Sequence, residues 1–349
     1  MTTPPEPPEP SLRLAIDTQA LAANWRALDR LSGKASAGAA VKADAYGVGA
    51  RQVVPVLREA GCRDFLVAHW SEVAPILALL PPDRLSVLHG PLSAHDVEYA
   101  RAAGVKPVIN SVHQARLWLD GGGGRCDLMV DTGINRLGVP LGEIGDPAIA
   151  ALQVDVLLSH LASADEDVAL NPTQQRRFAD AAGTIAHRRR SLCNSAGIML
   201  GPEFHGELTR PGISLYGGVP RPELAPHIRQ VVRPQAQVMQ VRDVEAGAGV
   251  GYNSTFVAPA PMRLGTIAIG YADGYLCCWS GKGRFGADGA VTPVVGRVSM
   301  DMTVVDLTHA PHVREGDWLE AEYSLPDAAA ASGLSQYELL TLMGRRFAR

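Results

Sequence analysis

Residues 36 to about 217 repeat one pattern, in which a short apolar run is followed by a polar residue and then by a longer stretch with apolar side chains at helical spacing. Short apolar runs bounded by turn residues predict buried strands, and the longer stretches predict crossover helices. The predicted strands cover residues 36–42, 64–68, 85–89, 106–109, 126–130, 154–159, 191–194 and 207–210. Eight strands alternating with helices predict an α/β fold, a closed (β/α)8 barrel of the TIM type rather than an open sheet.

The stretches between these strands predict helices, because each is long enough for a crossover and carries spaced apolar residues. The clearest helices are predicted over residues 49–60, 71–80, 111–120 and 172–189. Three consecutive arginines at 188–190 would then form the solvated end of the last of these helices.

After about residue 224 the pattern changes to alternating β-branched runs interrupted by glycine, which predicts a mostly antiparallel β domain. The predicted runs are residues 231–244, 262–270, 291–298 and 302–307. Ser335 and Glu338 have capping-box spacing and predict a helix that runs to Gly344. We therefore divide the chain into a tail (1–11), a barrel (12–223) and a C-terminal β domain (224–349).

Composition excludes several classes of function. The chain has 349 residues and a formal net charge of −4, so it offers no basic surface on which a nucleic acid would bind. No apolar run reaches the roughly 18 residues of a membrane span. The five cysteines lack Cys-x-x-Cys spacing, so neither disulfides nor a metal site is expected. Residues 1–11 have no apolar core of an export signal, and we expect a cytoplasmic protein.

The carboxyl ends of barrel strands are where such folds place their active sites. The polar residues found at these ends are Lys42, His69, His89, Asn110, Asp131, His160, Asn194, Ser195 and Arg210. His69, His89 and Asn110 are expected to be ordinary hydrogen-bonding residues. Lys42 stands out, because only four of the 32 basic residues are lysine and an amine, unlike a guanidinium, can lose its proton and form a Schiff base.

The segment Arg210, Pro211 and Gly212 predicts an anion site after the eighth strand. Proline at the first position of a short helix, with glycine beside it, leaves backbone N–H groups pointing outward, and barrels commonly bind phosphate at this place. Ser195 would add a hydroxyl to the same anion. A phosphorylated aldehyde bound to Lys42 accounts for both features, which points to pyridoxal 5′-phosphate.

Seven segments, in order along the chain, resemble the signature segments of the alanine racemase family. They are residues 40–47, 130–138, 194–195, 210–212, 251–252, 270–275 and 296–301. The resemblance covers nearly the whole chain from residue 12 to residue 349. It implies a homodimeric, pyridoxal phosphate-dependent isomerase that interconverts L- and D-alanine and supplies D-alanine for peptidoglycan.

The resemblance also implies roles for the residues that act on the substrate. Lys42 would hold the cofactor and serve as one of two acid/base catalysts. Tyr252 of the partner subunit would be the other, on the opposite face of the substrate, because inversion at Cα needs one base to remove the proton and another group to return it. Arg136, together with Met300 from the partner chain, would bind the substrate carboxylate.

Six residues would bind the cofactor, besides Lys42 itself. Arg210 would contact the pyridine nitrogen, and His160 would brace Arg210. The phosphate would be bound by Tyr46, Ser195, Gly212 and Ile213. Since an arginine does not hand over a proton, the ring would stay a weak electron sink, which favours prompt reprotonation over transamination.

Other activities stay open at this point. Many members of the family carry a carbamylated lysine where this chain has Met129, which changes the site near the substrate carboxylate and leaves a broad-specificity amino-acid racemase as an alternative. A non-catalytic carrier of pyridoxal phosphate would lack the β domain with Tyr252. A barrel-type decarboxylase would pair the ring nitrogen with a carboxylate, whereas Arg210 is present here.

Overall fold

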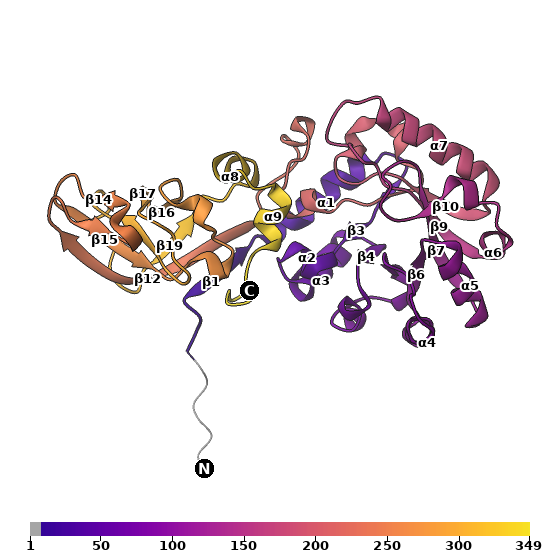
Figure 1. Cartoon of the computed structure of the whole chain (residues 1–349), viewed down its shortest axis with the longest axis horizontal. Coiled ribbons are helices and arrows are strands. Elements are labelled where there is room, and N and C mark those ends of the chain that lie inside the picture. Colours follow the sequence, from indigo (N-terminus) through magenta and orange to yellow (C-terminus); the bar gives the residue numbers. More distant parts are fainter. Residues whose placement is uncertain (1–7) are drawn as a thin grey trace, which may run out of the picture. The chain divides into compact units, whose positions relative to one another are not determined.

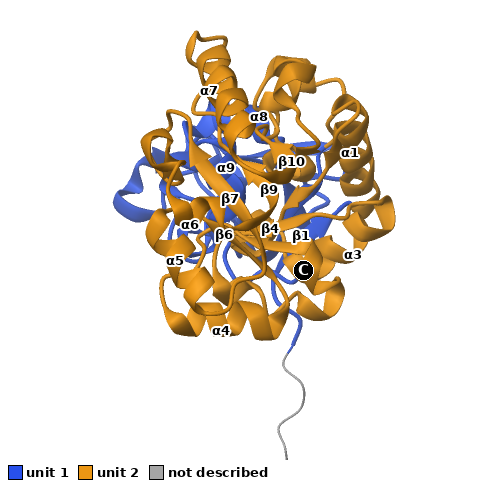
Figure 2. Cartoon of the chain, turned by 90° about the vertical axis from the view of Figure 1, so that its right-hand side faces the viewer, with its two compact units in different colours: residues 1–17, 230–349 blue, residues 18–229 orange. Residues whose placement is uncertain are grey.

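The computed structural model describes residues 8–349, which divide into two compact units (Figure 2). One unit is Thr18–Arg229, and the other joins the residues up to Asp17 to Gln230–Arg349. None of the helices in residues 8–349 has the length and apolar character that a membrane crossing requires. The two units are described separately below.

The unit Thr18–Arg229 is built around a parallel barrel. Its strands are β2 (Ser36–Ala37), β3 (Ala39–Ala40), β4 (Phe65–Val67), β5 (Leu85–Val87), β6 (Lys106–Ile109), β7 (Arg125–Asp131), β9 (Gln153–Leu158), β10 (His187–Ser191) and β11 (Leu208–Thr209), with β8 (Val139–Pro140) paired to β7. Neighbours from β3 to β10 pair in parallel, and β11 pairs with β2. The amides of Glu207 and Arg210 donate to the carbonyls of Arg190 and Cys193 at 2.9 and 2.8 Å. These bonds close the ring and confirm the predicted (β/α)8 barrel.

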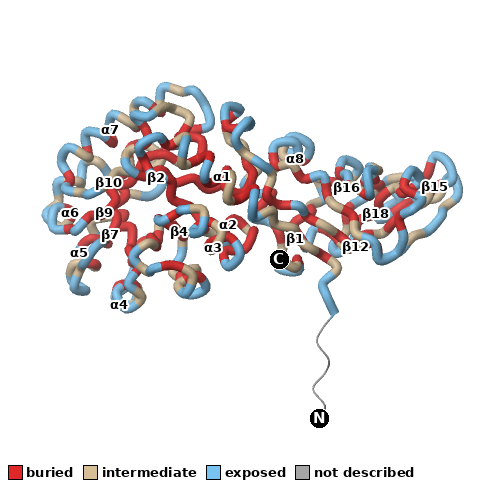
Figure 3. The backbone as a smooth tube through the Cα atoms, turned by 180° about the vertical axis from the view of Figure 1, so that it is seen from behind, coloured by how far each residue is buried: buried red, intermediate tan, exposed pale blue. Residues whose placement is uncertain are grey.

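Helices surround this barrel (Figure 1), whose strands are largely buried (Figure 3). They are α1 (Thr18–Leu31), α3 (Ala50–Ala60), α4 (Ala94–Ala103), α5 (Val112–Asp120), α6 (Pro147–Ala150) and α7 (Leu170–Thr184). The predicted helix over residues 71–80 was wrong, since the segment forms the short 3-10 turns η1 (Trp70–Glu72) and η2 (Leu77–Leu79). Pro75 lies in this segment and cannot donate the backbone hydrogen bond that an α-helix needs.

The seventh strand begins earlier than the sequence predicts. Helix α7 ends at Thr184 and β10 begins at His187, so the arginines at 188–190 form a strand and not the end of a helix. Arg189 binds Asp64 at 2.8 Å and Asp155 at 3.1 Å. Arg189 can occupy this strand because two buried acids, Asp155 of the neighbouring β9 and Asp64 just before β4, pair with it.

The other unit, unit 1 in Figure 2, is an antiparallel sheet, which confirms the predicted β domain, and this sheet closes into a barrel. Pairing runs from β12 (Val232–Val244) through β15 (Met262–Ile267), β18 (Thr303–Asp306), β17 (Ala290–Val295), β16 (Arg284–Ala287) and β19 (Trp318–Ala321), and β19 pairs back to β12. A hairpin of β13 (Gly249–Val250) and β14 (Phe256–Val257) and the helices α8 (Leu325–Ser332) and α9 (Gln336–Thr341) complete it. Ser335 caps α9 and accepts a hydrogen bond from the Glu338 amide at 3.2 Å, which confirms the predicted helix start.

The N-terminal strand β1 (Leu12–Ile16) pairs with β12 antiparallel, from Leu12 opposite Ala236 to Ile16 opposite Val232. The structure therefore groups residues 12–17 with the C-terminal unit, whereas the sequence-based division places them in the barrel. The later boundary lies between Arg229 and Gln230 instead of at residue 224. Most of the predicted tail, residues 1–7, lies outside the described residues.

Candidate active site

Lys42 lies two residues after the end of β3, at the mouth of the parallel barrel, and a left-handed turn follows it. The four residues Ala43, Asp44, Ala45 and Tyr46 all have φ between 52° and 58°. None of them is glycine, so each pays a steric penalty that persists only where the surroundings hold the backbone in place. Such strain is typical of functional sites, and here it immediately follows the candidate catalytic amine.

The surroundings of Lys42 favour its neutral form. Burial lowers the pKa of Lys42, the positive charge of Arg136 lowers it further, Glu72 opposes the shift, and Arg210 adds to the lowering. A lowered pKa makes more of the amine available as a nucleophile and proton acceptor near neutral pH.

The predicted phosphate site is assembled at the same mouth. The Ser195 hydroxyl accepts hydrogen bonds from the amides of Gly212 and Ser214, at 2.9 and 3.4 Å. A Cβ at residue 212 would overlap the Tyr46 hydroxyl, so a larger residue there would displace this hydroxyl from the site. Ile213 begins the 3-10 turn η7 (Ile213–Tyr216) directly after this glycine. Tyr46, Ser195, Gly212 and Ile213 thus form a cradle of hydroxyl and N–H groups, which fits a phosphate.

Arg210 projects from the end of β11 and is only 6% exposed. Its Nη1 donates to the Ser191 carbonyl at 2.7 Å and to the Ser191 hydroxyl at 2.6 Å, and its Nη2 donates to the Ser159 carbonyl at 2.6 Å. Burial lowers the pKa of Arg210 to about 10, which still leaves the guanidinium charged at neutral pH. Its Nε donates to no described residue, so this N–H is available to a pyridine nitrogen.

His160 lies close to this cation but is not its hydrogen-bonding partner among the described residues. Burial lowers the pKa of His160 to about 3, and the charges of Arg210, Arg136 and Lys42 act in the same direction. The imidazole is therefore neutral near pH 7.

Arg136 lies in the exposed loop that follows β7. The Asp131 carboxylate shapes this loop by accepting hydrogen bonds from the amides of Gly133 and Ile134, at 2.8 and 3.0 Å. The effect of Arg136 on the pKa of Lys42 and of His160 places its charge near both residues. Met129 is buried in an apolar cluster inside the barrel with Leu66, Val108, Val156, Leu158 and Leu208.

Tyr252 and Met300 belong to the other unit, where they are 69% and 53% exposed. Their loops adjoin one another: the Tyr271 amide donates to the Ser299 carbonyl at 3.0 Å, and Gly251 packs near Arg297. Tyr271 is exposed as well. The loops thus present two tyrosines and a methionine to solvent, and these residue types are enriched in protein–protein interfaces.

Comparison with known proteins decides the family. Residues 16–220 match the family model of the alanine racemase N-terminal domain, and residues 231–349 match that of the C-terminal domain. The chain belongs to the alanine racemase family. It is 42% identical to an alanine racemase of Rhodospirillum rubrum, over 96% of this chain and 94% of that protein. It is 40% identical to one of Rhizobium meliloti, over 97% of this chain and 96% of the relative.

Solved alanine racemases share the fold. The crystal structure of the Bartonella henselae alanine racemase, with covalently bound pyridoxal phosphate, superposes with a TM-score of 0.89 at 33% identity, covering 98% of this chain and 99% of that one. The biosynthetic enzyme of Pseudomonas aeruginosa gives a TM-score of 0.86 at 33% identity, with the same coverage.

Sequence reasoning did not find two further residues of this racemase-family site, Ser191 and Glu72. Ser191 was assigned to a strand only, and nothing in the sequence indicates that its hydroxyl contacts Arg210. Glu72 stands three residues after His69, at capping-box spacing, which could have marked it. The rings of His69 and His89 lie 4.1 Å apart, and Asn110 donates to the carbonyls of Leu88 and Val108.

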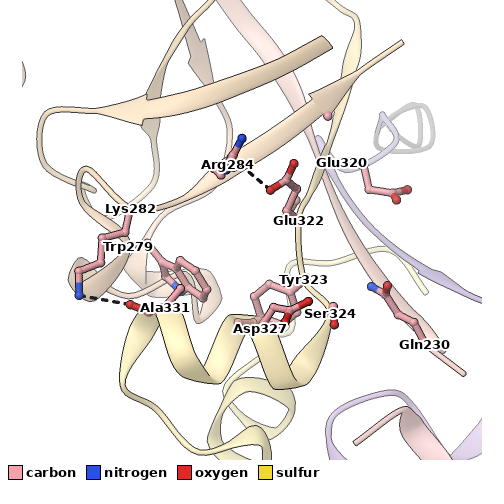
Figure 4. A pocket seen from close by; sticks show the side chains of 13 residues that line it. Gln230, Trp279, Lys282, Arg284, Glu320, Glu322, Tyr323, Ser324, Asp327 and Ala331 are labelled. Carbon is pink, nitrogen blue, oxygen red and sulfur yellow. Dashed lines mark hydrogen bonds and ion pairs between the residues drawn. The ribbon is translucent and has the colours of Figure 1, made fainter. Parts of the chain in front are cut away.

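A separate cavity of about 530 Å³ lies in the C-terminal unit, between β16, β19 and α8 (Figure 4). Its charges are largely paired: Arg284 binds Glu322 at 3.3 Å and Lys282 donates to the Ala331 carbonyl at 3.2 Å. None of the candidate site residues of the racemase lines this cavity.

Proposed function

We propose that this chain is a pyridoxal phosphate-dependent alanine racemase that interconverts L- and D-alanine. One observation supports the proposal above all others. Lys42, whose pKa is lowered, lies at the same barrel mouth as the phosphate cradle, in which Gly212 leaves room for the Tyr46 hydroxyl. When bound, the cofactor withdraws electrons from the substrate Cα and so makes its C–H bond acidic.

The protein itself orients the reactants and moves the protons. We propose that the cradle of Tyr46, Ser195, Gly212 and Ile213 binds the phosphate. The Lys42 amine would hold the cofactor aldehyde until the substrate amine takes its place, and the freed Lys42 amine would then accept or return the Cα proton on one face of the substrate. Because Arg210 keeps its proton at neutral pH, it donates a hydrogen bond to the ring nitrogen but does not protonate it. The ring is thus kept a modest electron sink, and racemisation is favoured over transamination. Neutral His160 adds no second charge beside Arg210.

The second proton donor comes from a second copy of the chain. We propose a homodimer in which Tyr252 and Met300 of one protomer reach the barrel mouth of the other, with Tyr252 on the opposite face of the substrate from Lys42. The exposure of both residues and of Tyr271 supports this, because a solvent-facing patch of tyrosine and methionine is suited to an interface. Arg136 would bind the substrate carboxylate, helped by its position in an exposed loop near Lys42.

We propose a biosynthetic role for the product. A relative in Agrobacterium fabrum, 38% identical over 97% of this chain, is named a biosynthetic alanine racemase, which supports such a role. We propose that this chain acts in the cytoplasm and supplies D-alanine for peptidoglycan. Restored growth of a D-alanine auxotroph that expresses this chain would test the role, and an unrelieved requirement for D-alanine would contradict it.

The activity is tested by adding pyridoxal phosphate to the purified protein and following racemisation of the common amino acids by polarimetry. We expect visible absorbance from the bound cofactor, a borohydride-stable mass increase on Lys42, and fastest turnover with alanine. Lys42→Ala should lose all three, with Lys282→Ala as a lysine control outside the site. A wild-type protein that takes up no cofactor would refute the proposal, and equal rates with larger amino acids would favour the broad-specificity alternative.

Shared sites are tested by complementation. Lys42→Ala and Tyr252→Phe each damage one half of a composite site, so a mixed dimer contains one site with both intact residues. Unfolding and refolding the two variants together should recover up to about a quarter of wild-type activity for random pairing. No recovery, with mixed dimers shown by mass spectrometry, would mean that each chain completes its own site.

A further inference from the structure

The carboxylate of Glu72 connects two segments at the barrel mouth. Its Oε2 accepts hydrogen bonds from the amides of Ala68 and His69, both at 2.8 Å, where β4 leads into η1. Its Oε1 accepts a hydrogen bond from the amide of Ala43, the residue that follows Lys42. One side chain therefore connects the end of β4 to the turn that follows the candidate catalytic lysine.

Part of this arrangement is an ordinary capping box. In the same unit, Asp96 of α4 accepts hydrogen bonds from the amides of Leu92 and Ser93, at 2.8 and 3.1 Å. The two bonds of Glu72 Oε2 to Ala68 and His69 repeat that pattern at η1. The bond to Ala43 has no counterpart at Asp96, because it reaches a residue 29 positions away in the sequence.

The Ala43 amide needs an external acceptor. It belongs to the first turn after Lys42, and the first N–H groups of any helical turn lack a carbonyl partner within that turn. The turn is also strained, since four successive non-glycine residues have left-handed φ values. Asp44 connects the turn to the start of α3 by accepting a hydrogen bond from the Ala50 amide at 2.7 Å. Glu72 holds the other end of the turn, at Ala43 beside Lys42.

Glu72 is also the one acidic group among those that shift the pKa of Lys42, and it acts against the two arginines. Arg136 and Arg210 act on the amine as cations, and the imidazole of His89 lies within the electrostatic influence of Lys42, His69 and Glu72. A carboxylate here partly offsets the two guanidinium groups, so that the field at the amine does not become strongly positive.

We propose that Glu72 is a positioning residue of this active site, which holds the left-handed turn by its bond to Ala43 and thereby fixes the direction of the Lys42 side chain. The inference rests on the proposed function for its catalytic consequence, while the contact itself concerns only this chain. Glu72 thus does more than cap η1. Asp96 is the matched control, because it caps α4 in the same way but forms no bond to the turn after Lys42.

The test compares Glu72→Gln with Asp96→Asn. Glutamine retains the shape of the side chain, but its Nε2 is a donor and cannot accept from a backbone amide, so at least one of the three bonds is lost. Hydrogen exchange followed by mass spectrometry reports on a peptide that spans residues 41–50, with and without pyridoxal phosphate. We expect exchange in this peptide to quicken about tenfold in Glu72→Gln, since hydrogen bonds to charged groups are the stronger ones. Asp96→Asn should leave it unchanged.

Kinetics supply a second readout. In Glu72→Gln, kcat for alanine should fall about tenfold with little change in KM, because the lysine is displaced while the carboxylate site of the substrate remains. Glu72→Asp keeps the charge but is one methylene shorter, so it should recover only part of both effects. Glu72→Asp also serves as the second variant if Glu72→Gln does not fold.

Two results would overturn the proposal. One is wild-type exchange over residues 41–50 in both Glu72 variants. The other is a Glu72→Gln protein whose kcat is unchanged and whose melting temperature falls only as far as that of Asp96→Asn. A wild-type protein that fails to bind pyridoxal phosphate would instead refute the proposed function, while the exchange measurement would still decide whether Glu72 holds the turn.

Discussion

Arg210 is anchored by Ser191 and not by an acidic residue. The Ser191 hydroxyl accepts from Arg210 Nη1 at 2.6 Å while donating to the Leu208 carbonyl at 2.5 Å, so it bridges β10 and β11 beneath the guanidinium. No carboxylate in the described part of the chain forms an ion pair with Arg210. The cation is thus fixed by neutral groups, and its full charge faces whatever occupies the barrel mouth.

Replacing Ser191 should therefore disturb the ring nitrogen of the cofactor. Ser191→Ala removes one bond to a buried cation, and we expect kcat for alanine to fall about tenfold. If Arg210 moves, the ring nitrogen can take a proton from water, so the visible spectrum of the bound cofactor should gain a pH-dependent transition near neutrality. Ser32→Ala is the control, because Ser32 is equally buried and its hydroxyl also reaches β11, through Thr209 at 2.8 Å, but forms no bond to Arg210 itself. Identical spectra in the two variants would show that Ser191 is only structural.

His160 should make the protein sensitive to acid. Burial lowers its pKa to about 3 in the folded state, against 6.5 for a histidine exposed to water, so between these values the unfolded chain binds a proton that the folded chain does not. The free energy of unfolding should then be undiminished above pH 6.5 and fall on acidification, by at most about 1.4 kcal/mol per pH unit for one proton. Urea titrations from pH 7 to pH 4.5 measure this slope. His160→Asn should have a shallower slope, and an equal slope in both proteins would contradict the burial of a neutral imidazole.

Tyr252→Phe should affect the two enantiomers unequally. Phenylalanine keeps the ring but removes the hydroxyl that handles the proton on one face of Cα, while Lys42 still acts on the other. With L- and D-alanine in deuterated solvent, Cα exchange without inversion should persist for one enantiomer and fall at least about a hundredfold for the other. Tyr271→Phe serves as the control from the same exposed patch. Equal losses for both enantiomers would reject the two-base mechanism.

Lys106 should be essential to the stability of the barrel. Its Nζ lies 2.8 Å from Asp155 and 3.3 Å from Asp127, and all three groups are buried. Burial acts to lower the pKa of Lys106, but the two carboxylates outweigh it and raise the pKa, so the lysine stays charged. Lys106→Met removes the cation that pairs with buried Asp127, whereas Asp155 keeps Arg125 and Arg189, and the uncompensated Asp127 should cost about 3–5 kcal/mol of unfolding free energy.

A second substitution tests whether charge imbalance is the cause. Lys106→Met combined with Asp127→Leu removes one acid together with the cation, and should recover part of the stability measured by urea unfolding. If the double variant is less stable than the single one by the full cost of a second buried substitution, the ion pair is not the source of the loss.

The phosphate cradle and the catalytic lysine could be predicted because their signals are local. Lys42 ends an apolar strand, and Arg210, Pro211 and Gly212 combine a helix start with residues that expose backbone N–H groups. The barrel could be predicted for a similar reason, since its strands and helices recur with regular spacing. Resemblance to a family added Tyr252, Met300 and Arg136, which lie in loops whose local sequence indicates no chemistry.

The seventh strand was misplaced because local pattern and tertiary context disagree there. Three arginines in a row are typical of a solvated helix end, yet Arg189 lies in β10 and binds Asp64 and Asp155. Asp155 lies in β9, 34 positions from Arg189, and Asp64 lies just before β4, 125 positions away, so no window of neighbouring residues reveals the pairing. The N-terminal strand β1 belongs to the C-terminal barrel for a similar reason. It pairs with β12, and the whole unit Thr18–Arg229 lies between these two strands in the sequence.

Apolar periodicity and turn residues act over a few positions, so the two kinds of β structure, most of the order of elements and the residue types at the strand ends could be predicted from the sequence. The groups that hold the catalytic residues in place could be identified only in the folded chain. Ser191 beneath Arg210 and Glu72 beside Ala43 are contacts between segments that are distant in the chain, and such contacts depend on barrel closure rather than on local preference.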